Sequence, residues 1–441
     1  MGINFPNTPS IGTTWPNPPV AGQPVYTWDG EKWGSGSGYG AIYMSDTPPA
    51  APAGSLWYET DTGLLYARVW DGDSLQWVQV LSGPPDAVLF NTVQALSETQ
   101  KVTARKNVYA APFDAMAYAG MQINGSMEVS QELGLTPRTT TGHVCDNWII
   151  SNSGTTAFSA STVVAGAGYN GIPNVFQAII TTGQASLGAN DYVQVYQFIE
   201  GYRVARLLYG FGTAQPVTIG FWTGHHRPGT YSISIRNSVF NRSYVTTYTQ
   251  NVGDTAEYKT VTIPGDASGT WLVNYDTGLI ISFALGAGTA YTTAPNVWTA
   301  GNFLAATGQI NGAAAASDVF RLTGVIVLPG IEAPIAARSA YIMRPYDQEL
   351  MMCKRYWCKT VTSHTSYQSF AGSSQGGNQV NFPVEMRVVP TLSQGALLTT
   401  STNLTGFNLL FPTTLGFVHS GSSTTSGTMS YSVYVHANAR L

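Results

Sequence analysis

Apolar and polar residues alternate along several short stretches in the middle of the chain. Residues 193–199 read VQVYQFI and residues 231–236 read YSISIR. A period of two places successive side chains on opposite faces of a β-strand. Turn sequences such as PGT, VGDT and PGDASGT separate these runs. Many short strands at close spacing predict a central β-sandwich or jelly roll over residues 121–335.

The N-terminal part repeats a small aromatic unit. Residues 25–33 (VYTWDGEKW) resemble residues 67–78 (ARVWDGDSLQWV), and in both an Asp-Gly pair separates two aromatic segments. Asp-Gly supplies the positive φ that tight hairpin turns need. We therefore expect a proline-rich, extended segment with the first hairpin over residues 1–34, and a small aromatic β-module over residues 35–81.

Residues 82–120 change character and predict a linker with one short helix. Ser97 and Gln100 have the spacing of a capping box, in which each side chain satisfies an N–H at a helix start. The helix is expected to run to about Val108, and its apolar face is too thin for a lone helix in water. It therefore needs a partner, which is either another domain or symmetry mates around an axis.

The C-terminal part, residues 336–441, is expected to combine a helix with a small β-domain. Pro345 suits a first helical turn, and the apolar pattern predicts a helix over residues 346–357. Short β patterns return at residues 380–382, 407–411 and 431–435. The fold class predicted for the whole chain is mainly β.

Composition narrows the possible partners. Only 10% of the 441 residues are charged, and the formal net charge is −4, from 20 Lys+Arg and 24 Asp+Glu. Without a basic block, binding to nucleic acid through phosphates has little support. The start has no signal-peptide pattern, and no long apolar run predicts a membrane helix. We expect synthesis in a cytoplasm without membrane insertion.

Motifs for covalent chemistry are weak. Three cysteines form no disulfide framework and are expected to be reduced. His225 and His226 are adjacent before a turn, a poor arrangement for one metal ion, and are expected to be solvated loop histidines. Cys353 and Cys358 are expected on one helix, too far round its axis to chelate a metal. We predict no catalytic residue, metal or cofactor, although carboxylates from distant strands could still meet in space.

The order of several motifs resembles that of tailed-bacteriophage fibre and virion-appendage proteins. The N-terminal motifs resemble the openings of such proteins, and the capping-box stretch is similar to a short helical motif in phage tail-fibre proteins. The middle of the chain is similar to a carbohydrate-binding-like β-sandwich found in phage fibres and spikes. The end of the chain resembles the C-terminal module of such appendages. The matching stretches are residues 5–12, 26–33, 97–108, 229–245, 259–271, 349–357, 382–391 and 437–441.

This resemblance implies a structural virion protein, usually a homotrimer, attached by its N-terminus to other proteins of the tail, baseplate, collar or head. We predict that the N-terminal segment docks on the particle and that the β-domains bind a bacterial surface polysaccharide by ring stacking. The anchoring candidates are Phe5, Pro6, Trp15, Trp28 and Trp33. The glycan-contact candidates, for which core packing is the alternative role, are Trp222, Tyr244, Trp271, Trp298 and Tyr367.

Two other functions are compatible with the sequence. A purely structural or decorative fibre on the head or collar would need the same fold. A polysaccharide depolymerase would need a groove with two carboxylates, and no repetitive β-helix pattern of the kind common in such spikes is evident.

Overall fold

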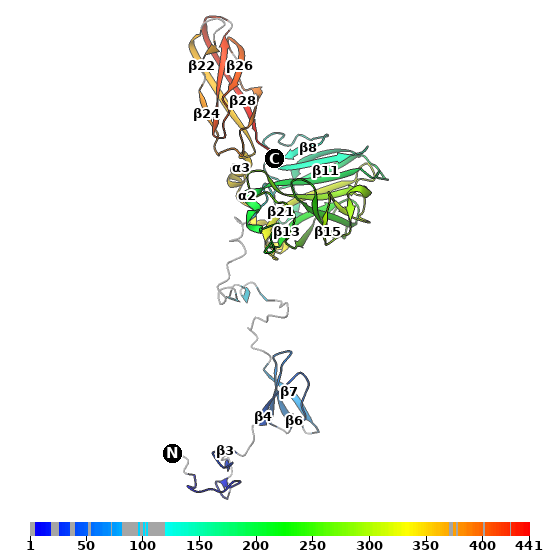
Figure 1. Ribbon diagram of the computed structural model, residues 1–441, viewed down its shortest axis with the longest axis vertical. Coiled ribbons are helices and arrows are strands. Elements are labelled where there is room, and N and C mark those ends of the chain that lie inside the picture. Colours follow the sequence, from blue (N-terminus) through cyan, green and yellow to red (C-terminus); the bar gives the residue numbers. More distant parts are fainter. Residues whose placement is uncertain are drawn as a thin grey trace. The chain divides into compact units, whose positions relative to one another are not determined.

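The fold is described from a computed structural model (Figure 1). The described residues are 5–18, 26–35, 40–51, 54–71, 73–81, 96–97, 100–101, 103–104, 120–369, 374–375, 378–399, 402–423 and 425–441. They are mainly β, which confirms the predicted fold class. The chain divides into two compact units, Met1–Ala111 and Pro112–Leu441.

The first unit contains two small sheets. One is antiparallel, in the order β1 (Thr14–Trp15), β2 (Tyr26–Trp28) and β3 (Trp33–Ser35). The other has the order β4 (Gly40–Ser45), β5 (Ser55–Glu59), β6 (Leu65–Trp70) and β7 (Leu75–Leu81). In this second sheet β4 and β5 are parallel, and the remaining pairs are antiparallel.

The aspartates of the repeated Asp-Gly element make the same hydrogen bonds in both copies. Asp29 Oδ1 accepts hydrogen bonds from the backbone N–H groups of Glu31 and Lys32, at 2.9 and 2.8 Å. Asp71 Oδ1 accepts from those of Asp73 and Ser74 at the same distances. These backbone donors lower the pKa of both carboxyl groups. Hydrogen bonding of the side chain to its own turn explains why aspartate precedes the glycine.

The predicted capping box is confirmed. The Ser97 N–H donates to Gln100 Oε1 at 2.9 Å, and the Gln100 N–H donates to Ser97 Oγ at 3.3 Å. Gln100, Lys101, Thr103 and Ala104 are helical. The rest of the helix expected up to Val108 lies outside the described residues.

The second unit begins with a sandwich of two antiparallel sheets (Figure 1). The five-stranded sheet has the order β10 (Ala157–Val164), β11 (Asn174–Thr182), β21 (Val319–Pro329), β13 (Val217–His225) and β16 (Glu257–Ile263). The seven-stranded sheet has the order β19 (Trp298–Ala300), β15 (Arg242–Gln250), β14 (Gly229–Arg236), β17 (Thr277–Ala287), β12 (Tyr192–Glu200), β9 (Trp148–Ser153) and β8 (Gly142–Cys145).

Alternation along these strands builds the sandwich core. Val193 and Val195 of β12 and Ile233 and Ile235 of β14 are buried against the five-stranded sheet. Phe221 of that sheet and Phe283 of β17 meet edge to face, with ring centroids 5.0 Å apart. The residues between these core positions therefore point away from the core, onto the outer face of the seven-stranded sheet.

Shorter elements complete the sandwich, and a second, smaller domain follows it. The short elements are α2 (Gly201–Val204), the 3₁₀ turns Ala167–Tyr169, Ala205–Leu207 and Thr289–Tyr291, and the parallel pair β18 (Thr292–Thr293) and β20 (Ala305–Ala306). The small domain has one sheet of β22 (Trp357–Ser369), β28 (Gly427–Asn438) and β25 (Thr391–Leu397). Its other sheet contains β23 (Ser374–Gln375), β24 (Gln379–Asn381), β27 (Gly416–Ser423) and β26 (Leu404–Leu410).

The 3₁₀ helix Ala336–Ile342 and helix α3 (Tyr346–Lys354) join the two domains of this unit. The helix predicted over residues 346–357 therefore ends earlier, because Trp357 already begins β22. Glu200 at the end of β12 accepts hydrogen bonds from Arg355 Nη2 and from the Tyr356 hydroxyl, both at 2.6 Å. This carboxylate ties the sandwich to the segment that leads into the small domain.

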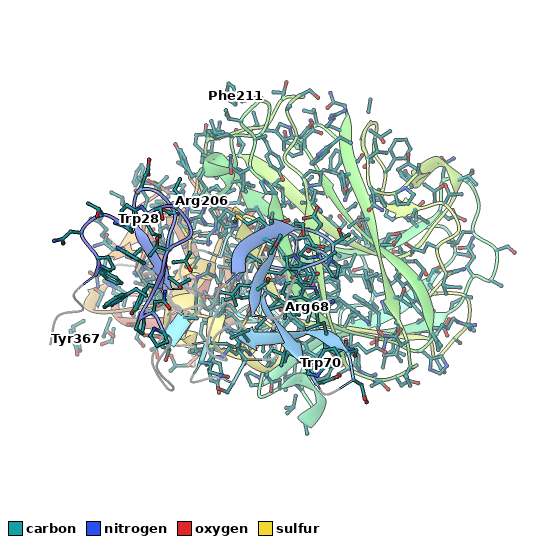
Figure 2. All side chains as sticks on the ribbon, turned by 90° about the horizontal axis from the view of Figure 1, so that it is seen from below. Trp28, Arg68, Trp70, Arg206, Phe211 and Tyr367 are labelled. Atoms are coloured by element: carbon teal, nitrogen blue, oxygen red, sulfur yellow. The ribbon has the colours of Figure 1, made fainter. Side chains whose placement is uncertain are left out.

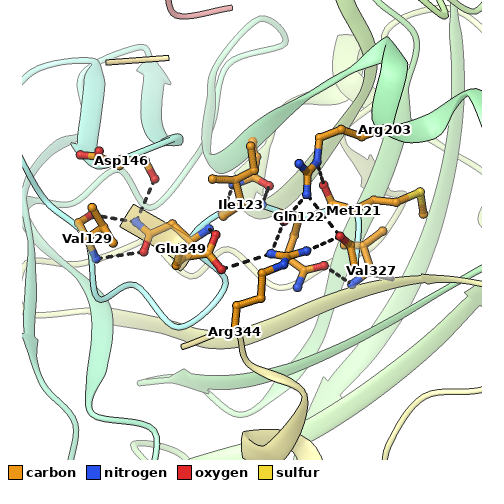
Figure 3. A network of polar contacts seen from close by, with 12 residues as sticks. Met121, Gln122, Ile123, Val129, Asp146, Arg203, Val327, Arg344 and Glu349 are labelled. Atoms are coloured by element: carbon orange, nitrogen blue, oxygen red, sulfur yellow. Dashed lines mark hydrogen bonds and ion pairs between the residues drawn. The ribbon is translucent and has the colours of Figure 1, made fainter. Parts of the chain in front are cut away.

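The start of the second unit is held by a buried polar network (Figure 3). Arg203 Nε donates to the Met121 carbonyl at 2.8 Å, and Arg344 Nη1 donates to the Gln122 carbonyl at 3.0 Å. Glu349 accepts from the backbone N–H of Asn124 at 2.6 Å. Residues 121–124 are thereby attached both to the sandwich and to α3, although they are not part of a strand.

Candidate binding site

The outer face of the seven-stranded sheet carries polar and aromatic side chains. Gln194 and Tyr196 alternate with the core valines of β12, and Arg236 follows the core residue Ile235 on β14. Ser282 of β17 lies between them, because it pairs with Tyr196 on one side and Ser234 on the other. Strand alternation and the pairing of β12, β17 and β14 together bring these polar groups onto one surface.

The segment from Tyr291 to Ala306 crosses this outer face and forms a wall. The backbone N–H groups of Phe303 and Ala306 donate to Ser243 Oγ and Ser232 Oγ, at 3.0 and 2.9 Å. The N–H of Leu304 donates to the Tyr291 carbonyl at 2.8 Å. Outward serines on β14 and β15 thus fix the segment, and the part of the sheet beside it stays uncovered.

A hollow of about 220 Å³ lies where the crossing segment leaves the sheet open. We call it the Arg236 hollow. Its lining consists of Thr141, Ser151, Tyr192, Gln194, Tyr196, Arg236, Phe240, Tyr291, Asn302 and Leu304.

Aromatic rings form much of this lining. Tyr192 and Tyr291 meet edge to face, with centroids 5.1 Å apart, and both are half-buried. The Phe240 ring lies 5.3 Å from the Arg236 guanidinium carbon. Phe240 has a φ of 56°, in the left-handed region that bulky residues rarely adopt. The turn therefore holds this ring over the guanidinium in a backbone conformation that costs free energy.

Arg236 forms the floor of the hollow and is only 2% exposed. Its Nη1 donates to Asn302 Oδ1 at 2.8 Å, and its Nη2 donates to Gln194 Oε1 at 3.0 Å and to Ser282 Oγ at 2.5 Å. Burial lowers the pKa of Arg236 to about 10, so the group stays charged at neutral pH. The arrangement presents one positive charge among tyrosines, amides and hydroxyls.

These groups suit recognition better than covalent chemistry. The lining of the Arg236 hollow includes no carboxyl, imidazole or thiol group. Within the ranges that the structure describes, no group of three or more His, Cys, Asp or Glu residues could hold a metal ion. Ring faces and fixed hydrogen-bonding groups around a small hollow are typical of a ligand site.

A larger hollow of about 460 Å³ lies beside α3. Its lining consists of Arg203, Arg344, Asp347, Gln348, Met351 and Met352. Arg203 and Arg344 are the arginines of the buried network in Figure 3, where they bind backbone carbonyls and Glu349. Both arginines are thus used to hold residues 121–124 in place. We therefore take the Arg236 hollow as the better candidate for ligand binding.

The structure does not bring the five predicted glycan-contact rings together. Trp271 and Tyr244 are 9% and 5% exposed, and both pack against the half-buried Trp298. Trp222, 8% exposed, lies on the other sheet under the 3₁₀ helix Ala336–Ile342, and its indole N–H donates to Ser339 at 2.9 Å. Three of the candidate rings are therefore core residues, which was their alternative role: Trp222, Tyr244 and Trp271. A covered ring offers little face to a sugar.

Tyr367 differs from the other four candidates. It lies on β22 of the small domain and is 79% exposed (Figure 2). It is also remote in sequence and in fold from the residues that line the Arg236 hollow. Its ring is available to a partner, and a glycan contact there stays a prediction.

The sequence reasoning missed the aromatic residues of the Arg236 hollow, although a signal was present. In the run Tyr192–Glu200 the valines occupy one face, so Tyr192, Gln194 and Tyr196 must share the other. Tyr291, Phe240 and Asn302 gave no such signal, because they lie in turns and loops that only the folded chain brings to this face.

The predicted anchoring residues belong to the first unit. Phe5 stacks on Trp33 with centroids 4.8 Å apart and meets Tyr26 edge to face at 5.1 Å. Trp28 packs against Trp33 at 5.6 Å. Trp15 lies on β1 opposite Tyr26, and Pro6, next to Phe5, is half-buried. These rings form a small cluster of their own, and their role in docking stays a prediction.

Two expectations about reactive side chains need correction. His225 is not a solvated loop residue, because it ends β13, is 2% exposed and stacks on Tyr231 at 3.5 Å. His226 points to solvent and lies 2.8 Å from Asp254. Cys358 lies on β22 rather than on the helix with Cys353. As predicted, the three cysteines are unpaired, and burial raises the pKa of each thiol.

No protein-family model matches this chain, and no curated protein matches its sequence. Among solved structures it is similar to the enzymatically active domain of tailspike protein 4 of bacteriophage CBA120, at 14% identity and a TM-score of 0.28. That match covers 48% of this chain and 22% of the tailspike chain.

Carbohydrate-binding modules are also among the similar structures. TmCBM61 in complex with β-1,4-galactotriose is 13% identical, with a TM-score of 0.24, and the match covers 48% of this chain and 98% of the module. The family 11 module of a Clostridium thermocellum cellulase is 15% identical, with a TM-score of 0.23, covering 45% of this chain and 98% of the module.

Among the described residues, none of the helices combines the length and apolarity that crossing a membrane would require.

Proposed function

We propose that this chain is a glycan-binding protein and that the Arg236 hollow is its binding site. The observation that carries the proposal is that half-buried tyrosines and hydrogen-bonded amide groups line one hollow. This hollow lies on the outer face of the seven-stranded sheet, beside the segment that crosses that face.

The chemistry of the lining matches that of a sugar. Tyr192, Tyr196 and Tyr291 offer apolar ring surface to the C–H faces of a pyranose, together with hydroxyls that can bond its own hydroxyls. Gln194 and Asn302 are already oriented by Arg236, so their amide groups lose little further freedom when a ligand binds. A hollow of this size accommodates about one sugar residue of a longer chain.

Binding of purified protein to a panel of bacterial surface polysaccharides tests this proposal. Wild-type protein should bind at least one polymer, and the double substitution Tyr192→Ala/Tyr196→Ala should weaken that binding about tenfold or more. Tyr341→Ala is the matched control, because Tyr341 is 69% exposed and outside the hollow. Equal loss in the double variant and the control, or no binding by wild-type protein, would contradict the proposal.

We also propose that the protein is made in a bacterial host cytoplasm and becomes part of a bacteriophage virion as a homotrimeric fibre or spike. The order of its sequence motifs supports this role. The second sheet of the first unit supports association, because Val69 and Val78 are 43% and 50% exposed. Trp57 and Trp77 pack together on the opposite face of that sheet. A half-exposed apolar sheet face is suited to burial against further copies.

The oligomeric state and the position on the particle test this second proposal. Light scattering of purified protein should give three times the mass of one chain, and Val69→Asp/Val78→Asp should lower it. Antibody labelling of particles should find the protein on tail, baseplate, collar or head. A monomeric wild-type protein that is absent from particles would contradict the virion role.

The proposed activity is binding without turnover. A purely decorative fibre would bind no polysaccharide, whereas a depolymerase would release oligosaccharides from one. Release of reducing ends by purified protein would therefore contradict a solely adhesive function.

A further inference from the structure

We propose that the Arg236 hollow selects an acidic sugar, with a ligand carboxylate placed against the Arg236 guanidinium. This inference rests on the proposed glycan-binding function and names the class of glycan that the site takes. Its basis is a buried positive charge whose partners among the described residues are all neutral.

Several other buried or half-buried arginines of this unit have carboxylate partners, while Arg203 donates to backbone carbonyls of residues 120–122. Arg344 pairs with Glu349 at 3.1 Å, Arg242 with Asp266 at 2.6 Å, and Arg355 with Glu200 at 2.6 Å. Arg236 is at least as buried as these, yet no Asp or Glu in the described ranges lies within ion-pair distance of it. Its hydrogen-bond acceptors are an asparagine, a glutamine and a serine.

The guanidinium also keeps unused donors. An arginine carries five N–H groups, and the three hydrogen bonds of Arg236 to described residues leave two without an acceptor. One of these is Nε–H, which is buried without a partner. A buried charge that lacks both a counter-ion and part of its hydrogen bonds is costly, and a bound anion removes that cost.

The surroundings admit an anion and do not repel it. The lining includes no carboxyl group, although Asp and Glu outnumber Lys and Arg in the chain as a whole. Phe240 covers one side of the guanidinium, while Tyr192, Tyr196 and Tyr291 supply ring surface and hydroxyls nearby. A neutral sugar would use these rings and leave the charge uncompensated. A uronic acid would use the rings and form a charge-assisted hydrogen bond as well.

Matched polysaccharide pairs test this inference. Polygalacturonate, alginate and hyaluronan fragments are each titrated against the full-length protein beside their carboxyl-reduced, neutral forms, with dextran sulfate as a generic polyanion. We expect wild-type protein to bind at least one acidic fragment about tenfold more tightly than its reduced form, and more tightly than dextran sulfate.

Three variants locate the effect. Arg236→Gln should remove the preference for the acidic form while leaving weak binding to the neutral form, and Arg236→Lys should restore part of the preference. Arg321→Gln is the matched control, because Arg321 is half-buried on β21, outside the hollow, and lies 3.7 Å from Asp254. Circular dichroism of each variant shows whether it has folded, and the wild-type comparison decides the question even if Arg236→Gln does not fold.

The outcomes separate the two proposals. Equal binding of acidic and reduced forms would overturn the acidic preference and leave glycan binding intact. A preference that survives in Arg236→Gln, or that dextran sulfate shares, would overturn the role of Arg236. Binding of glycans that is insensitive to Tyr192→Ala/Tyr196→Ala, or no binding of any kind, would overturn both proposals.

Discussion

Arg344 and Glu349 form an ion pair in the interior of the second unit, with Nη1 and Oε2 3.1 Å apart and side chains 3% and 4% exposed. Arg344 lies just before α3 and Glu349 lies within it. Because Arg344 also binds the Gln122 carbonyl and Glu349 the Asn124 N–H, the pair holds the start of the sandwich against α3 (Figure 3).

Removal of one partner of this pair should be strongly destabilising. Glu349→Ala leaves the Arg344 charge buried without a counter-ion, so the free energy of unfolding should fall by about 3–5 kcal/mol. Replacement of both partners by methionine should cost less than Glu349→Ala, because no unpaired charge then remains. Denaturant titration measures both values, and a loss under about 1 kcal/mol for Glu349→Ala would contradict the interpretation.

Acid should destabilise the sandwich through His225. Burial lowers the pKa of His225 to about 3, from an ordinary value of 6.5. Between these values the unfolded chain binds a proton that the folded chain does not, so the free energy of unfolding falls as the pH falls. This one group should account for about 2 kcal/mol between pH 6.5 and 4.5.

Denaturant titration at several pH values checks this dependence. His225→Phe should remove about 2 kcal/mol of the loss in unfolding free energy between pH 6.5 and 4.5. His226→Phe, at a half-exposed position, is the control. An unchanged slope in His225→Phe would show that the imidazole does not carry the effect.

Phe240 should contribute more to binding than to stability. Asparagine tolerates left-handed φ better than phenylalanine, so Phe240→Asn should change the Tm by no more than a few degrees or raise it. Loss of the ring over Arg236 should weaken binding of an acidic oligosaccharide about threefold or more. Calorimetry measures the binding, and Phe211→Asn is the control, because Phe211 is 63% exposed and outside the hollow (Figure 2). If both variants bound like wild-type protein, the prediction would be contradicted.

Trp271 and Tyr367 should behave oppositely although both were glycan-contact candidates. Trp271 is buried against Tyr209 and Trp298, so Trp271→Ala should cost about 3–5 kcal/mol of unfolding free energy. Tyr367→Ala, at a 79% exposed position (Figure 2), should stay within about 0.5 kcal/mol of wild type. Similar stability of the two variants would show that the ring of Trp271 is not part of the core.

Deletion of residues 1–34 should leave the second unit folded. The core of the sandwich and that of the small domain consist of residues from 121 onward, so this deletion removes none of them. Thermal unfolding of the second unit should be unchanged, while incorporation into particles should be lost if this segment is the anchor. Normal incorporation of the truncated protein would contradict the anchoring role.

Local rules account for much of the fold. The alternation over residues 193–199 and 231–236, the Asp29 and Asp71 turns and the Ser97–Gln100 capping box depend on neighbouring residues, and the structure contains all of them. Pro345 marked the start of α3 correctly. The helix end was placed too late, because the pairing of Trp357 with Asn438 in β28 overrides the local helical pattern.

The binding site was decided by tertiary structure. Alternation divides the side chains of a strand into two faces, but it does not say which face meets another sheet, so Trp222 and Trp271 could not be separated from exposed rings. The partners of Arg236 come from β12, β17 and the loop at Asn302, more than 40 residues away in each case. The sequence by itself thus determined the strands and turns, because these follow from contacts between near neighbours. Only the folded chain placed an arginine without an acid beside three tyrosines, since that arrangement depends on which distant strands pair.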